Sequence, residues 1–170
     1  RDISITANSA TTATYCFYYT RMLKKLKFHS ASVPDFSYGL TYAAGWSSKN
    51  TSFSDIDINL PSCTNFTSTF LHSGGAGHLT YIPSIDLSAA TNLTNTFNSN
   101  LRLAQVKATG MSVNFSLLDA SLSSTALDEV YTNIADLTGL TGRTITVTGN
   151  PGVYTDTPSI ATNKNWTVTG

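Results

Sequence analysis

Two stretches of this chain repeat one another: Asn65-Phe66-Thr67-Ser68-Thr69-Phe70 and Asn92-Leu93-Thr94-Asn95-Thr96-Phe97. They lie 27 residues apart, and each follows a short segment of mixed apolar and polar residues, over 56–61 and 82–88. Self-similarity at such a period is typical of proteins built from stacked units. Weaker matches extend the pattern to five units spaced by 20 to 27 residues, at 12–17, 39–44 and 112–117.

Each unit combines two elements that cannot bury their apolar sides alone. Alternation over 56–60 points successive side chains to opposite faces and predicts a strand. The second stretch begins with a group that can cap a short helical turn, and it places Leu93 and Phe97 on one side. Stacked units would bury both sides. We therefore expect strands around 56–60, 84–88 and 103–108 to be neighbours in one parallel sheet.

The run over 79–97 also resembles a known family. Its sequence, L-T-Y-I-P-S-I-D-L-S-A-A-T-N-L-T-N-T-F, is similar to the unit of BspA-like leucine-rich repeats, found in bacterial surface proteins and phage structural proteins. The resemblance implies an α/β repeat solenoid: a right-handed stack with short parallel strands on one face and short helices or turns on the other. The family's F-x-x-C ending is missing after Phe70 and Phe97, so the repeat is degenerate here. The alternative is an irregular α+β or β-sandwich domain.

The C-terminal part resembles the ending of such an array. Residues 121–134 are similar to its final helix, 144–152 to its last strand and turn, and 159–170 to a short closing helix and strand. Ser124 or Thr125 can cap the helix, whose expected core-facing residues are Leu127, Val130, Tyr131 and Ile134. We expect repeat coils over 1–121 and a cap of the same domain over 122–170. No N-terminal cap is recognisable, so we expect more protein upstream of Arg1.

Composition limits the classes of partner. Hydrophobic residues make up 41% of the chain, which favours a folded domain, whereas charged residues make up only 12%. Ser and Thr supply 48 of 170 positions, which suits packing beside copies of the chain or contact with glycans. A net charge of zero argues against nucleic acid, and no apolar run is long enough for a membrane span. The basic cluster at Arg21, Lys24, Lys25 and Lys27 is interpreted as a solvated edge.

Histidines and cysteines suggest no chemistry. His72 and His78 flank a glycine-rich loop that lacks the G-K-[ST] of a phosphate-binding loop, so we expect a flexible loop. Cys16 and Cys63 are not in a C-x-x-C motif, which leaves two buried free thiols or a disulfide. We expect no metal site and no cofactor.

Two pairs of carboxylates are candidates for the acid and base of sugar hydrolysis. Asp55 with Asp57, or Asp86 with Asp119, would be such a pair. In the repeat, however, Asp57 and Asp86 recur on the exposed side of successive strands, which explains them without catalysis. We therefore expect no catalytic residue.

The remaining candidate is a contact face on the exposed side of the strands, formed by His29, Asp57, Asn59, Asp86 and Lys107. The resemblance favours a non-enzymatic structural or adhesive module of a phage virion: a tail fibre, decoration or capsid-associated protein, extracellular and on the virion surface. Its expected partners are other virion or surface proteins, copies of itself, or a host-surface glycan or protein. The alternatives are a bacterial cell-surface adhesin or fibre subunit and, from another class, a glycan-active enzyme domain.

Overall fold

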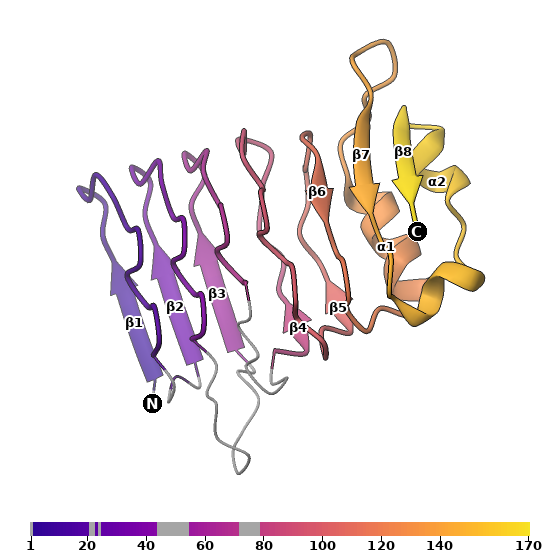
Figure 1. Ribbon diagram of the computed structural model, residues 1–170. Helices are drawn as coiled ribbons and strands as arrows, with labels where there is room; N and C mark the ends of the chain where they lie inside the picture. The colour runs from indigo at the N-terminus through magenta and orange to yellow at the C-terminus, as the bar shows by residue number, and fades with distance from the viewer. Residues whose placement is uncertain (1, 21–22, 24, 44–54, 72–78) are drawn as a thin grey trace.

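The computed structural model describes residues 2–20, 23, 25–43, 55–71 and 79–170. In chain order, its elements are β1 (Asp2–Thr6), β2 (Lys25–His29), β3 (Asp55–Asn59), β4 (Tyr81–Ile82), β5 (Gln105–Val106), β6 (Phe115–Ser116), α1 (Ser124–Asn133), β7 (Arg143–Thr146), the 3-10 helix η1 (Pro151–Tyr154), α2 (Ser159–Thr162) and β8 (Trp166–Thr169). Figure 1 shows the strands following one another in chain order, with α1 and α2 gathered at the C-terminal end.

The strands form three parallel sheets, in the orders β1-β2-β3, β4-β5 and β6-β7-β8. The protein is therefore a small α/β protein with short parallel strands. The expectation of one sheet is wrong, because β3 and β4 belong to different sheets. The strand expected over 84–88 is displaced to 81–82. Pro83 follows it and has no N–H to continue the ladder, and Asp86 forms only a single bridge with Thr109.

The first two strands were not recognised as part of the repeat, although their sequences alternate. DISIT and KLKFH pair in register with the DIDIN of β3, so that Ile3, Leu26 and Ile56 stand side by side. The fifth repeat match, over 112–117, is also corrected, because Phe115–Ser116 is a strand rather than a turn.

The expected helical turns are instead ladders of tight turns, over 13–20, 36–43, 66–71 and 93–98, which we call the turn segments. Their backbone N–H groups have two kinds of acceptor in alternation. One N–H donates to a carbonyl of the next turn segment, and the following N–H donates to the carbonyl three residues earlier in its own segment. Thus the N–H of Tyr15 donates to the carbonyl of Ser37 at 3.1 Å, and that of Cys16 donates to Ala13. The same pattern joins 36–43 to 66–71 and 66–71 to 93–98, so stacking continues where the sheet is interrupted between β3 and β4.

These turns need left-handed residues at regular positions. Tyr15, Tyr38, Ser68 and Asn95 occupy matching places in successive turn segments, and all have φ between 54° and 56°. Such a conformation is incompatible with a continuous α-helix. Leu93 and Phe97 are nevertheless both buried, as their spacing predicts.

The core is a row of aromatic rings between the strands and the turn segments. Phe36, Phe66, Phe70 and Phe97 are fully buried. At the C-terminal end, Phe97 contacts Phe115, whose ring lies edge-on to Trp166 at 5.8 Å. Burial of such large apolar surfaces is the main favourable term that holds the stack together.

The C-terminal elements lie where the sequence predicts them. The side chain of Ser123, one residue before the expected cap, accepts from the N–H of Ala126 at the start of α1. Leu127, Val130, Tyr131 and Ile134 are buried as expected. Among the described residues, no helix is long and apolar enough to cross a membrane.

Candidate contact face on the first sheet

The exposed side of the β1–β3 sheet carries an ordered array of polar and charged side chains, which we call the strand face. Alternation sends Leu26 and Phe28 of β2 into the core, so Lys25, Lys27 and His29 point to the other side. The parallel register then places each of them between two residues of the flanking strands: Asp2 and Asp55 beside Lys25, Ser4 and Asp57 beside Lys27, and Thr6 and Asn59 beside His29.

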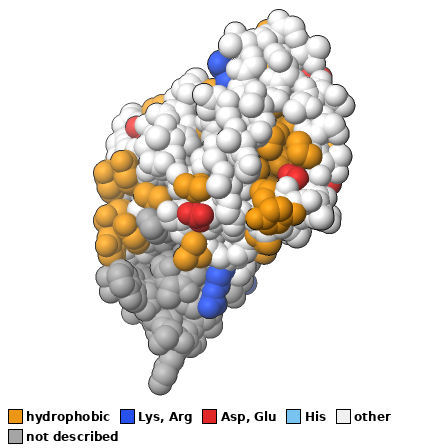
Figure 2. Space-filling view, turned by 45° about the vertical axis from the view of Figure 1, so that its right-hand side comes forward, with side chains coloured by type: hydrophobic (Ala, Val, Ile, Leu, Met, Phe, Trp, Pro, Cys, Tyr) orange, Lys and Arg blue, Asp and Glu red, His pale blue; other side chains and the backbone are white. Residues whose placement is uncertain are grey.

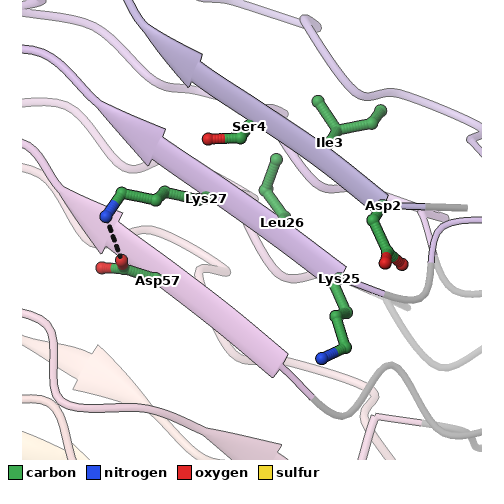
Figure 3. Close-up of a pocket in the computed structure, with 7 residues that line it drawn as sticks. All are labelled: Asp2, Ile3, Ser4, Lys25, Leu26, Lys27 and Asp57. Atoms are coloured by element: carbon green, nitrogen blue, oxygen red, sulfur yellow. Dashed lines mark ion pairs between the residues drawn. The ribbon is translucent and has the colours of Figure 1, made fainter.

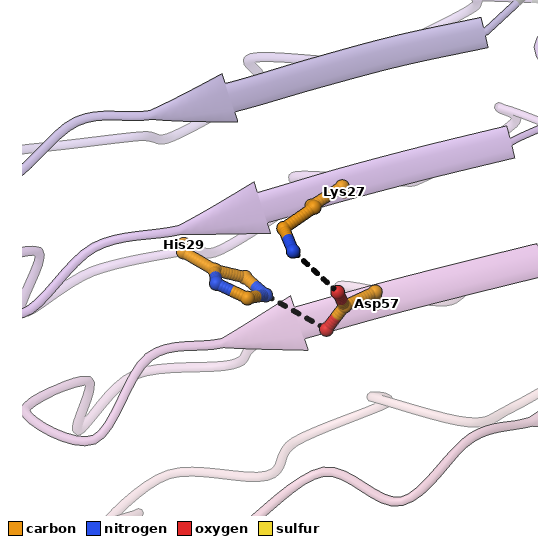
Figure 4. A network of polar contacts seen from close by, with 3 residues as sticks. All are labelled: Lys27, His29 and Asp57. Carbon is orange, nitrogen blue, oxygen red and sulfur yellow. Dashed lines mark hydrogen bonds and ion pairs between the residues drawn. The ribbon is translucent and has the colours of Figure 1, made fainter.

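Asp57 is the centre of this array (Figure 4). One carboxylate oxygen lies 2.7 Å from Nε2 of His29, and the other lies 3.4 Å from Nζ of Lys27. Because a carboxylate only accepts, this hydrogen bond places a proton on Nε2 of His29. The bond from His29, followed by the charges of His29 and Lys27, lowers the pKa of the Asp57 carboxyl below its usual value. Asp57 is therefore ionised across the physiological pH range.

These interactions are solvent-exposed. The side chains of Lys27 and Asp57 are 52% and 50% exposed, so water screens their attraction and the pair contributes little to stability. The charges are thus accessible to a partner, and displacing water from them requires no rearrangement of the core.

A shallow hollow of about 310 Å³ opens at this sheet (Figure 3). It is lined by Asp2, Ile3, Ser4, Lys25, Leu26, Lys27 and Asp57. Figure 3 shows Asp2 and Lys25 at the beginning of their strands and the Lys27–Asp57 pair further along. The carboxylates of this lining are those of Asp2 and Asp57. The two residues are two strands and two register positions apart, which separates their Cα atoms by roughly 12 Å. Asp57 is moreover already engaged by two side chains.

The structure divides the contact face expected from sequence. His29, Asp57 and Asn59 lie together on β2 and β3. Asp86 and Lys107 lie by the second sheet, β4–β5. Asp86 forms the bridge with Thr109, and its carboxylate accepts from the N–H of Ser88. Nζ of Lys107 lies 6.0 Å from the centroid of the Tyr81 ring. No described contact joins these two residues to the Asp57 group.

Sequence reasoning missed Asp2, Lys25 and Lys27 as members of the strand face. The lysines were interpreted as a solvated edge, yet they occupy the exposed side of β2, the central strand of its sheet. Period-two alternation in KLKFH was the signal that could have placed them. Arg21, Lys24, His72 and His78 lie outside the described residues, as does the side chain of Asp55.

A second hollow, of about 510 Å³, lies where α1 meets β4 and β5. Of its lining residues, Glu129 alone carries a carboxylate, and it accepts a hydrogen bond of 2.7 Å from the amide of Gln105. Elsewhere in the described ranges, no group of three His, Cys, Asp or Glu side chains is placed to hold a metal ion.

Both cysteines are free thiols, but the expectation that both are buried is wrong for one of them. Cys16 is exposed, whereas Cys63 is buried. Burial raises the pKa of the Cys63 thiol to about 11, so this thiol remains protonated and unreactive at neutral pH.

On the described part of the face seen in Figure 2, uncharged polar side chains and backbone predominate, and few charged side chains are visible. No protein-family model matches this chain, no curated protein is significantly similar to it in sequence, and no solved structure is significantly similar to it in fold.

Proposed function

We propose that this chain is a leucine-rich-repeat-like solenoid, stacked in a right-handed sense, that serves as a non-enzymatic adhesive or structural module on the surface of a phage virion. The stacking of successive turn segments and the in-register strands of the first sheet support the solenoid. Residues 122–170 form its cap. The alternative location is the surface of a bacterial cell.

One observation carries the functional proposal: the charge on the strand face. The whole chain is only 12% charged, yet the central strand β2 alternates Lys, Lys and His on its exposed side, flanked by acidic residues of β1 and β3. Fixed charges of both signs on a rigid sheet favour specific recognition of a complementary surface more than they favour stability. The strand face is therefore the proposed contact with another virion protein or a host-surface molecule.

The geometry gives less support to a glycan-active enzyme. Glycoside hydrolysis needs a proton-donating acid and a second carboxylate on either side of the scissile bond. Asp2 and Asp57 are too far apart for this pair of roles, and Asp57 is already bound by Lys27 and His29.

Immunogold electron microscopy would test the location. Antibodies raised against the purified chain would be applied to phage particles and to bacterial cells. Gold on particle tails or capsids supports the virion proposal, and gold on the cell envelope supports the alternative. Gold confined to the interior of cells would contradict both.

Charge reversal would test the strand face. Co-sedimentation of the labelled protein with the particles or cells that carry it should weaken at least about tenfold in Lys27→Glu. Arg102→Glu is the matched control, because Arg102 is exposed and lies outside the first sheet. Equal binding by both variants would remove the strand face as the contact.

A further inference from the structure

Five tyrosines form a continuous cluster on the turn side of the first two units. Tyr15, Tyr18 and Tyr19 come from the turn segment 13–20, and Tyr38 and Tyr42 come from 36–43. The rings of Tyr15 and Tyr38 stack at 4.7 Å with an angle of 1°, and those of Tyr19 and Tyr42 lie 4.9 Å apart. Tyr18 joins the two pairs through edge contacts with Tyr15, Tyr19 and Tyr42. We call this the tyrosine cluster.

The cluster is exposed rather than part of the core. Tyr15, Tyr18 and Tyr19 are 53%, 39% and 41% exposed. The pKa of the Tyr18 phenol is raised, first by desolvation and then by the four neighbouring phenols. Its hydroxyl therefore remains protonated and able to donate a hydrogen bond at any physiological pH.

The backbone beneath four of these rings is strained. Tyr15, Tyr19, Tyr38 and Tyr42 have φ between 55° and 57°, where a bulky side chain is disfavoured. Later turn segments place Ser68 and Asn95 in this conformation instead, and Ser99, which follows the last of them, adopts it too. Tyrosine is therefore not required by the turn. Strain held at an exposed aromatic surface is typical of a functional site.

The chemistry of the cluster indicates its ligand. No charged residue occurs within 12–20 or 36–43, which Arg21 and Asp35 adjoin in sequence, and the partly exposed Thr14 supplies a hydroxyl there. The three most exposed rings present on the order of 300 Å², well below the roughly 800 Å² that each partner buries in a stable protein interface. A pyranose fits this surface, because its C–H face packs on aromatic rings and its hydroxyls can bond phenol oxygens.

We propose that the tyrosine cluster is a binding site for neutral glycans, formed by the exposed rings of Tyr15, Tyr18 and Tyr19 with Tyr38 and Tyr42 stacked beside them. This inference rests on the proposed adhesive function and adds a ligand class and a second surface, separate from the strand face.

Native affinity electrophoresis provides the test, in gels that contain dextran, yeast mannan or soluble β-glucan, with alginate as an anionic comparison. At least one neutral polysaccharide should retard the parent protein. The double variant Tyr15→Asn with Tyr38→Asn should weaken binding at least about tenfold, and its melting temperature should not fall, since asparagine tolerates the left-handed turn. Tyr154→Asn is the matched control, because Tyr154 is 89% exposed and lies in η1.

Three results would overturn the proposal. The first is no retardation by any neutral polysaccharide. The second is retardation that the double variant retains. The third is concentration-dependent dimerisation in analytical ultracentrifugation that the double variant loses, which would make the cluster an interface between copies of the chain. Lys27→Glu should leave retardation unchanged, so failure of this site is distinguishable from failure of the strand face.

Discussion

Asp57 illustrates how a single residue on the strand face responds to pH. Its carboxyl has a pKa below the value of about 3.9 expected in an unfolded chain. A lowered folded-state pKa means that the interaction stabilises the protein above the unfolded value, and that this contribution is lost as the pH falls through the folded value.

We therefore expect Asp57→Asn to lower the free energy of unfolding by less than about 1 kcal/mol at pH 7, because the pair is half exposed. The difference from the parent should shrink as the pH falls below about 4 and disappear once the pH is below the lowered folded-state pKa of Asp57. Urea unfolding from pH 2.5 to 8 measures it, with Asp86→Asn as control. A difference that is constant over this range would show that the carboxylate's charge is not responsible.

Thr69 represents the buried hydroxyls that link turn segments. Its Oγ1 donates at 2.9 Å to the carbonyl of Phe66 within its own segment and lies 3.0 Å from the carbonyl of Phe36 in the preceding one. Thr69→Val removes this hydrogen bonding without changing the shape of the side chain. It should cost about 1 kcal/mol of unfolding free energy.

Chemical denaturation would measure this loss. Thr167→Val, at an exposed position of β8, should change stability by less than about 0.5 kcal/mol. Equal effects of the two substitutions would mean that the hydroxyl of Thr69 is not a link between segments.

At the scale of the element, the turn segments depend on residues that tolerate the left-handed conformation. Asn95 is exposed and has φ of 54°, so a substitution there tests the backbone rather than the core. Asn95→Val should destabilise the protein by about 1–2 kcal/mol, because a β-branched residue is strained at positive φ. Asn95→Gly should be well tolerated.

The neighbouring exposed residue provides the comparison. Thr94 is not among the residues with positive φ, so Thr94→Val should change the melting temperature very little. If both valine variants melt like the parent, the turn segment does not require a left-handed residue at 95.

At the scale of the whole molecule, the C-terminal elements are joined to the units before them by hydrogen bonds and by the aromatic core. The N–H of Gly110 donates to the carbonyl of Asn133 at the end of α1, and the N–H of Ala135 donates to Met111. The indole of Trp166 packs against Phe115. We therefore expect the described chain to unfold as one cooperative unit.

Fluorescence of Trp166, measured in a Trp46→Phe background, should follow the same thermal transition as far-ultraviolet circular dichroism. A transition of Trp166 at a lower temperature would instead make residues 122–170 a separately unfolding part. Far-ultraviolet spectra of the parent and of Trp46→Phe control for the substitution itself.

The amino-acid sequence by itself determined several local patterns of burial. Alternation in DIDIN, the four-residue spacing of Leu93 and Phe97, and the helical pattern after Ser123 are local properties of the chain, and each was borne out in the structure. Local pattern is informative here because burial in short elements follows their periodicity.

Only the tertiary structure decided how the units meet. Left-handed turns replaced the expected helical turns, β3 and β4 fell in separate sheets, and Asp86 and Lys107 were set apart from the Asp57 group. Register also brought Lys27, His29 and Asp57 together, and stacking brought Tyr15 onto Tyr38. Neither grouping is visible in sequence, because each joins two segments 20 or more positions apart, and hydrogen bonds between neighbouring units fix the alignment of those segments.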